Sequence, residues 1–399
     1  LHDALPISFA GTVALGDTLL LSPPNRSARV RSLRVQDHPA DSGRAGQRIA
    51  LALSGIEKAE VARGQWMVAP GLHAPVRSFD ARVRVLAGQP ALKHWTLVHL
   101  HLGAEDVPAR IALLGGEQIA PGTENWAHIS VDREIGTLAG DRFILRDAAA
   151  RHTIGGGEVL DIFPPSRKKR APARLALLAA LADPDPAVAL QLAAGQQPAG
   201  LELTAYAQNR NLDASAVQAL CQRLALKVVG HTAFSPDGWA MLEARLLDAL
   251  ATEHARAPDL TGVERDRLRR LTLPTLSRPA FDALLAAPLA DGRVAQTHAW
   301  LHLPAHRVQL SPADQDLWLT LKPLLLAEPC NPPRVRDVAR ATGLAEDSVR
   351  SLFKRIARHG DAWPVAQDHY FAAEAVAQLA QRVAELNLRD GFARAAPLR

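Results

Sequence analysis

Short hydrophobic runs separated by turn residues dominate the first part of the chain. Hydrophobic and polar residues alternate along segment 28–35, although the period slips at Leu33, and a more continuously apolar segment follows at 48–53. Alternation of this kind predicts half-buried strands, and several short strands at such spacing favour a small barrel over a βαβ fold. We predict a first β-barrel over residues 9–76, with Arg48 as a lone cation at the start of its apolar strand.

The same pattern continues over residues 77–165, where we predict a second β-barrel. Its expected strands are 81–86, 95–102, 109–114, 126–131 and 141–146. The three glycines at 155–157 are disfavoured as a phosphate loop, because no Lys-Ser/Thr pair follows them and no helix is expected to begin there. We favour a bulge in the strand that closes the barrel.

Two histidines of this second barrel raise the question of a metal. His99 and His101 are two residues apart on one expected strand, so their side chains point to the same face. No third ligand follows at a suitable spacing. We therefore expect solvated or hydrogen-bonded histidines, and no metal site.

A basic run marks the point where the sequence changes from strand-like to helix-like. It consists of Arg167, Lys168, Lys169 and Arg170, and an Ala- and Leu-rich segment follows it. Such a run could contact RNA phosphates. Basic runs at domain boundaries are more often solvated linkers, and we favour that interpretation.

Helical hydrophobic stripes recur through the rest of the chain. The stripes are Val217, Leu220, Cys221 and Leu224; Phe281, Leu284 and Leu285; and Val349, Leu352, Phe353 and Ile356. Their first members are 281 − 217 = 64 and 349 − 281 = 68 residues apart, and a short two-stranded signal follows each stripe. Helix, turn, helix and wing in this order are typical of a winged-helix domain. We predict three of them, over 170–236, 237–305 and 306–371.

The third repeat is more basic than the other two. The stripe helix of the second repeat carries only Arg278 and Asp282, which suits a spacer. In the third repeat we predict an RNA-binding set of Arg334, Arg336, Arg340, Arg350, Lys354, Arg355 and Arg358. A basic helix face is usually only solvated, yet this density makes contact with an RNA backbone a testable hypothesis.

Composition narrows the class of protein further. The 399 residues carry a net charge of +5, which favours a nucleic-acid partner without specifying it. Only Cys221 and Cys330 are present, and no apolar run reaches the length of a membrane span, so we expect a cytoplasmic protein without a membrane partner. An independent enzyme is the least favoured class, because no catalytic constellation stands out and we assign no catalytic residue.

Several motifs resemble those of a known family. Gly16-Asp17, the segment 45–51 and Arg63-Gly64 resemble the second domain of the selenocysteine-specific elongation factor, the SelB family. The segment 140–147, Gly-Asp-Arg-Phe-Ile-Leu-Arg-Asp, together with 153–157 resembles its third domain. Each motif alone is modest, since translational GTPases share such barrels. Their order, followed by the winged-helix repeats, is specific.

The resemblance implies both a fold and a function. The fold would be two small translation-factor-type β-barrels followed by a tandem array of winged-helix domains. The function would be translation elongation for selenocysteine incorporation. The barrels would bind selenocysteyl-tRNA, and the winged helices would connect it to the selenocysteine-insertion hairpin of the messenger RNA on the ribosome. We expect the factor to be a monomer.

The same resemblance predicts that the chain is a fragment. A family member is a GTPase that needs GTP and Mg²⁺, but no Gly-x-x-x-x-Gly-Lys-Ser/Thr loop occurs in this sequence. We therefore expect the N-terminal GTPase domain to be missing, and with it any cofactor or GTPase activity of this chain. The first methionine is Met67, and residues 1–8 show no period that joins them to the strands after Gly11, so we expect a non-native leader. Residues 372–399 are expected to form a linker helix and the truncated start of a fourth winged helix, which puts hairpin contact by this chain in doubt.

The sequence leaves two roles open for the Arg48 side chain. On composition, a half-exposed strand arginine pairs with an acid such as Asp17 or Glu57. Within the family resemblance, its guanidinium would lie in the aminoacyl pocket and select a selenol, which is largely ionised at neutral pH, over a serine hydroxyl.

Two alternative functions also stay open. Another translational GTPase, such as an initiation factor gamma subunit, would share the barrels but lack the winged-helix array. A winged-helix nucleic-acid-binding regulator would have the array but not the barrels.

Overall fold

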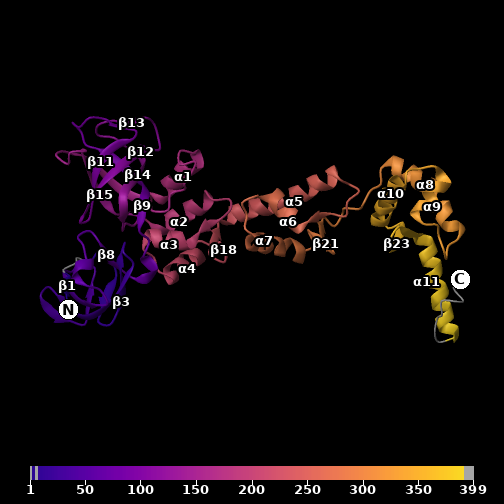
Figure 1. The fold of residues 1–399 in the computed structure, drawn as a ribbon, viewed down its shortest axis with the longest axis horizontal. Coiled ribbons are helices and arrows are strands. Elements are labelled where there is room, and N and C mark those ends of the chain that lie inside the picture. The colour runs from indigo at the N-terminus through magenta and orange to yellow at the C-terminus, as the bar shows by residue number, and fades with distance from the viewer. Residues whose placement is uncertain (1, 5–7, 391–399) are drawn as a thin grey trace. The chain divides into compact units, whose positions relative to one another are not determined.

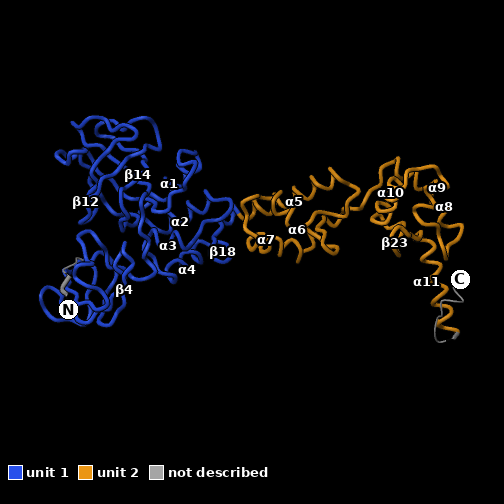
Figure 2. The backbone as a smooth tube through the Cα atoms, in the orientation of Figure 1, with its two compact units in different colours: residues 1–238 blue, residues 239–399 orange. Residues whose placement is uncertain are grey.

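The computed structural model describes residues 2–4 and 8–390, which divide into two compact units, 1–238 and 239–399 (Figures 1 and 2). The first unit contains both β-regions and the first winged helix, and the second contains the other two winged helices. Within the described ranges, every helix is too short or too polar to cross a membrane.

The first β-region is a sheet with strand order β1-β7-β4-β3-β8, in which β5 also pairs with β4. The strands are β1 (His2–Ala4), β3 (Thr18–Ser22), β4 (Arg26–Val35), β5 (His38–Ala40), β7 (Ile49–Ser54) and β8 (Trp66–Val68). A separate ladder joins β2 (Thr12–Ala14) to β6 (Ser42–Arg44). The register of β4 against β7 shifts between Val30 and Ser32, which confirms the break in alternation seen in the sequence.

One expectation for this region needs correction. The ladders between the described strands do not close into a barrel, because the sheet ends at β1 and β8. Strand β1 (His2–Ala4) pairs with Ala52 and its neighbours on β7, and the non-native leader over residues 1–8 stays a prediction. Backbone pairing had no sequence signal there because three residues are too few to show a period.

The second β-region is a closed barrel with strand order β11-β12-β14-β9-β16-β15, as predicted. Its strands are β9 (Val76–Val85), β11 (Thr96–Leu102), β12 (Glu105–Leu113), β14 (Glu124–Ile135), β15 (Arg142–Arg146) and β16 (Thr153–Asp161), and β10 (Leu92–Lys93) pairs with β13 (Gln118–Ile119) beside it. Alternate residues such as Phe79, Ala81 and Val83 are fully buried in the interior. The period of two therefore gives the strands a core face, although Asp80 between Phe79 and Ala81 is buried as well.

The glycine run lies in β16, the strand that joins β15 to β9. A Cβ atom on Gly155 would come within 2.4 Å of the Arg84 carbonyl oxygen, and one on Gly157 within 2.1 Å of the Arg82 carbonyl oxygen. The register shifts fall on either side of the run, before Gly155 and after Val159. The glycines therefore permit close approach of backbones, and the predicted bulge flanks them.

The first winged helix follows the barrel in the same unit. Its elements are α1 (Pro172–Leu181), α2 (Pro186–Gly195), β17 (Leu201–Glu202), α3 (Leu203–Arg210), α4 (Ala214–Arg223), β18 (Lys227–Val229) and β19 (Thr232–Phe234). Asp213 caps α4 by accepting a hydrogen bond from the Ala216 backbone N–H at 2.7 Å. Val217 and Cys221 of the predicted stripe are buried in the domain core.

The second unit repeats this arrangement. The second winged helix consists of α5 (Pro236–Arg256), β20 (Val263–Glu264), α6 (Arg265–Thr272), α7 (Arg278–Ala290), β21 (Ala295–Thr297) and β22 (Trp300–His302). The third consists of α8 (Pro312–Ala327), α9 (Val335–Thr342), α10 (Glu346–His359), β23 (Ala362–Ala366) and β24 (His369–Ala372), and α11 (Ala373–Asp390) follows. All seven stripe residues on α7 and α10 are at most 1% exposed. The helix expected after residue 372 is therefore α11, and the predicted fourth winged helix lies outside the described residues.

Candidate functional site

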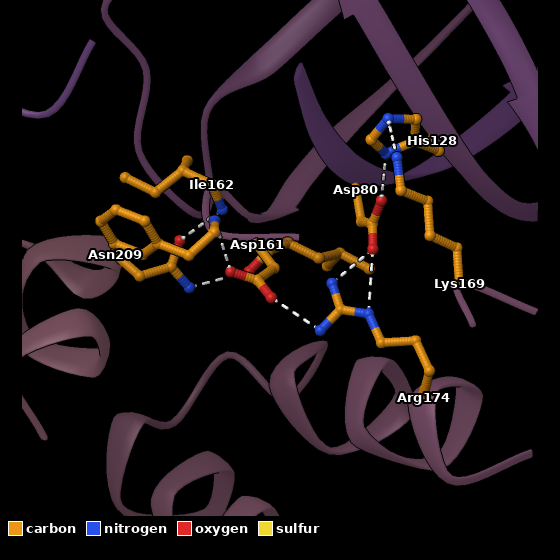
Figure 3. Close-up of polar contacts among 9 residues, drawn as sticks. Asp80, His128, Asp161, Ile162, Lys169, Arg174 and Asn209 are labelled. Carbon is orange, nitrogen blue, oxygen red and sulfur yellow. Dashed lines mark hydrogen bonds and ion pairs between the residues drawn. The ribbon is translucent and has the colours of Figure 1, made fainter. Parts of the chain in front are cut away.

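A buried polar network joins the closed barrel to the first winged helix (Figure 3). At its centre is Asp80 of β9, whose side chain is fully buried. Its Oδ2 accepts hydrogen bonds from Nε of Arg174 on α1, at 3.0 Å, and from Nη2 of the same guanidinium. Its Oδ1 lies 2.7 Å from Nδ1 of His128 on β14. One carboxylate thus connects two barrel strands to a helix that lies 94 residues further along the chain.

The guanidinium of Arg174 bridges a second acid. Its Nη1 lies 2.7 Å from Oδ2 of Asp161, at the end of β16, and only 7% of the arginine side chain is exposed. Burial opposes the charge, yet the carboxylates of Asp161 and Asp80 raise the pKa of Arg174 above its usual value. Asn209 of α3 adds a neutral link, because its amide donates to the Leu160 carbonyl at 2.9 Å and accepts from the Ile162 N–H at 3.1 Å.

Lys169 of the predicted basic linker belongs to this junction, and Arg170 lies beside it. Nζ of Lys169 lies 2.7 Å from Nε2 of His128. An ammonium has no acceptor, so Nε2 of the imidazole accepts and its Nδ1–H faces Asp80. Arg170 donates to the Gly116 carbonyl at 3.0 Å and pairs with Glu117. The solvated-linker interpretation is therefore wrong for Lys169, whereas Arg170 is 49% exposed and Arg167 and Lys168 are exposed as well.

The junction positions domains rather than performing chemistry. Each of its charged groups is engaged by an opposite charge or a hydrogen-bond partner, and Leu114, Leu160 and Leu178 form a small apolar core beside it. A buried charge network of this kind strongly disfavours the loss of any one member, since the others are left uncompensated. The network therefore fixes α1 and α3 against the barrel.

Arg48 lies just before β7 and is exposed. Its Nη2 is 2.6 Å from Oδ2 of Asp37, and the two side chains are 58% and 74% exposed. Neither acid considered from the sequence is the partner, because the Asp17 carboxylate accepts from the Ala14 N–H and Glu57 caps a short 3-10 helix. An exposed pair of this kind is weak, so the guanidinium is accessible to a ligand.

The structure divides the predicted RNA-binding set in two. Arg355 makes a bidentate pair with Asp314 of α8, at 2.9 and 2.6 Å. Arg350 bonds to Asp368 at 2.8 and 3.0 Å, and also pairs with Glu346 and Asp347. These hydrogen bonds hold the pKa of both Asp314 and Asp368 below the usual value. Arg350 and Arg355 therefore serve mainly to hold the third winged helix together.

The other members of the set are exposed. They are Arg334, Arg336 and Arg340 around α9, and Lys354 and Arg358 on α10. Arg336 and Arg340 only approach Asp337, at 3.6 and 3.9 Å. Helix α10 packs against α9 and against the wing strand β23. These exposed cations are the positive surface that a polyanion could reach.

The histidines of β11 interact with an acid. Nδ1 of His99 lies 3.1 Å from Oδ1 of Asp106, and Nε2 of His101 lies 3.8 Å from the same oxygen. The hydrogen bond from His99 lowers the pKa of Asp106. In the part of the chain that the structure describes, no group of three or more His, Cys, Asp or Glu side chains could hold a metal ion.

Comparisons with known proteins give two family matches. Residues 80–166 match the model for the beta-barrel domain of the selenocysteine-specific elongation factor, and residues 247–303 match the winged helix of elongation factor SelB. The selenocysteine-specific elongation factor of Escherichia coli strain K12 is 32% identical over 397 residues, which cover 98% of this chain and 62% of the relative. That of Haemophilus influenzae is 30% identical, covering 95% and 61%.

A solved structure is similar in fold. The crystal structure of the bacterial selenocysteine-specific elongation factor EF-Sec matches with a TM-score of 0.53 at 15% identity, over 99% of this chain and 65% of that one. The chain thus spans about three fifths of the length of the curated relatives it matches. The fragment prediction is not supported, because a match along 98% of this chain is equally compatible with a shorter relative of these proteins.

Proposed function

We propose that the chain acts in selenocysteine incorporation as an elongation factor of the SelB family, a membership that both family models and the curated relatives strongly support. The observation that carries the proposal is the order of the domains: a closed barrel matched by one family model precedes a winged helix matched by the other. The proposed activity is binding and delivery in the cytoplasm. GTP and Mg²⁺ are expected for a translational GTPase, but this sequence holds no phosphate-binding loop for them.

The proposed cargo of the β-regions is selenocysteyl-tRNA. The test is the affinity of the 399-residue chain for one tRNA carrying either selenocysteine or serine. We expect tighter binding of the selenocysteyl form. Equal affinities for the two forms would refute selective carriage, whatever the chain does with RNA in general.

Arg48 is the proposed selectivity residue of this cargo site. Its guanidinium is accessible, and its partner Asp37 is more exposed than Arg48 itself, so a selenolate could replace that acid. A hydrogen bond to a charged group contributes roughly 1.5–3 kcal/mol, which corresponds to about 10- to 150-fold in affinity. Arg48→Ala should therefore weaken binding of the selenocysteyl form and leave the seryl form nearly unchanged.

Two control variants sharpen this test. Arg48→Lys keeps the charge and should retain part of the preference. Asp37→Asn removes the ion pair but keeps the guanidinium, so the preference should persist. Equal losses of both tRNA forms in Arg48→Ala would make the arginine merely structural.

The third winged helix is the proposed contact with RNA, namely the selenocysteine-insertion hairpin on the ribosome. The support is its group of exposed cations, particularly Lys354 and Arg358 on α10. Reversing both charges with Lys354→Glu and Arg358→Glu should lower RNA affinity and flatten its salt dependence, because fewer counterions are released. The same reversal at Arg223 and Arg245, which are exposed on α4 and α5, is the matched control and should have little effect. An unchanged salt slope in the Lys354 and Arg358 variant would refute the contact.

A further inference from the structure

The wing of the third winged helix carries aromatic side chains on its outer face. Ala362, Tyr370 and Ala372 are buried, whereas Trp363 lies opposite Phe371 in the ladder between β23 and β24. Alternation along β24, together with the pairing of Trp363 with Phe371, places this second pair on the face away from the core. Trp363 is 57% exposed, an unusual exposure for the largest apolar side chain.

This wing is held firmly on the domain. The carboxylate of Asp368, in the turn between the two strands, accepts two hydrogen bonds from Arg350 of α10. The Asp368 carbonyl also accepts from the Val335 N–H at 3.0 Å, and Nε2 of His369 lies 2.8 Å from the Pro332 carbonyl oxygen. The wing is therefore fixed before any partner arrives, which lowers the entropy cost of binding.

The charges around the wing favour an anionic partner. Arg334 is exposed and lies between Pro332 and Val335, the two residues that bond to the wing. Lys354 is exposed on α10, and its charge acts on Asp368. The nearby carboxylates of Glu346, Asp347 and Asp368 are all paired with Arg350. Positive charge thus lies beside the turn of the wing that presents the accessible indole, while the neighbouring acids are paired with Arg350.

We propose that this wing is a stacking platform for unpaired RNA bases, in which Trp363 stacks on a base and Arg334 and Lys354 contact the adjoining phosphates. The proposal rests on the RNA contact proposed for the third winged helix and specifies the part of the RNA that is read. An indole stacks on the face of a base, and that face is available only where the base is not already stacked in a helix. The platform therefore binds loop or bulge nucleotides, because a continuous duplex offers no free base face to Trp363.

The experiment compares two RNA probes on the full chain. One is a hairpin whose unpaired loop contains 2-aminopurine, and the other is a fully paired RNA duplex of the same length. We expect Trp363→Ala to weaken hairpin binding about tenfold, because the loss of stacking on a single base lowers affinity by roughly this factor. It should abolish the change in 2-aminopurine fluorescence on binding, and leave both duplex affinity and the salt slope unchanged.

Matched variants make the outcome specific. Trp363→Phe keeps a ring and should restore most of the hairpin affinity. Leu319→Ala removes another apolar side chain of the same domain, 67% exposed on α8, and should have no effect. An unchanged hairpin affinity in Trp363→Ala, or equal losses on both probes, would overturn the platform. If the Lys354 and Arg358 reversal still flattens the salt slope in that case, the proposed RNA contact stands without the platform, whereas failure of both overturns the contact as well.

Discussion

The junction of the first unit and the basic surface of the third winged helix use the same residue type in opposite ways. Arg174 is 7% exposed and bridges Asp80 and Asp161, whereas Arg340 is 81% exposed and only approaches Asp337 at 3.9 Å. A buried arginine with two carboxylates fixes the position of a helix. An exposed arginine with a distant acid stays available to a ligand. Burial and partner geometry, rather than residue type, decide between these roles.

The largest expected effect comes from breaking the junction. Arg174→Leu leaves Asp80 and Asp161 without their shared cation in a buried site, so it should lower the free energy of unfolding of the first unit by about 3–5 kcal/mol. Denaturant unfolding followed by hydrogen exchange in α1 and α3 measures this loss. Arg170→Leu, at an exposed pair of the same segment, is the control and should cost less than about 1 kcal/mol. A similar loss of unfolding free energy in both variants would show that burial does not distinguish the Arg174 network from an exposed ion pair.

A smaller loss of stability is expected from breaking the half-buried ion pair of Arg355, a member of the predicted RNA-binding set. Asp314→Asn removes the carboxylate to which Arg355 donates two hydrogen bonds. It should destabilise the third winged helix by about 1–3 kcal/mol. The RNA affinity of the folded variant should be unchanged or slightly higher. Reduced RNA affinity at temperatures well below unfolding would show that the pair itself contributes to binding.

The half-buried imidazole of His254 in the second winged helix should make the stability of that domain depend on pH. His254 stacks on His306, with ring centroids 3.7 Å apart, and accepts from the Leu303 N–H at 3.1 Å. Burial and then the neighbouring His306 lower the pKa of His254 from 6.5 to about 4. The unfolded chain therefore binds the proton first, so His254 contributes stability that is present above pH 6.5 and is lost as the pH falls toward 4.

Denaturant midpoints of the second unit at pH 7 and pH 5 test this direction. We expect a lower midpoint at pH 5, and a smaller difference in His254→Gln, which can still accept from the Leu303 N–H. A midpoint difference that His254→Gln leaves unchanged would assign the pH dependence to other groups.

The smallest effect on stability is expected at Arg48. Its pair with Asp37 is exposed on both sides, so Arg48→Ala should change the free energy of unfolding by less than about 1 kcal/mol. Thermal unfolding checks this value alongside tRNA affinity. Lost selenocysteyl preference with unchanged stability would separate the proposed ligand role from a structural one, and a large destabilisation would contradict the exposed geometry.

Sequence reasoning predicted the elements better than the site. The strands of the closed barrel and the helical stripes, such as Val349 with Phe353, followed from local periods that packing preserves. The closure expected around the first sheet did not follow, because closure depends on pairing between sheet edges, which the periodicity of single strands does not encode. The basic run showed the same limit: its four cations are similar in sequence, yet Lys169 contacts the buried His128 whereas Arg167, Lys168 and Arg170 are exposed.

The sequence by itself determined that barrel strands precede repeated winged helices, and it identified the cations among which an RNA contact should be sought. Only the tertiary structure decided which of those cations are already engaged. Arg355 meets Asp314 across 41 residues, and Arg174 meets Asp80 across 94. Hydrophobic periodicity specifies which face of an element is buried, but it does not specify which distant acid packs opposite an arginine, and that pairing separates a structural charge from one that is free to bind.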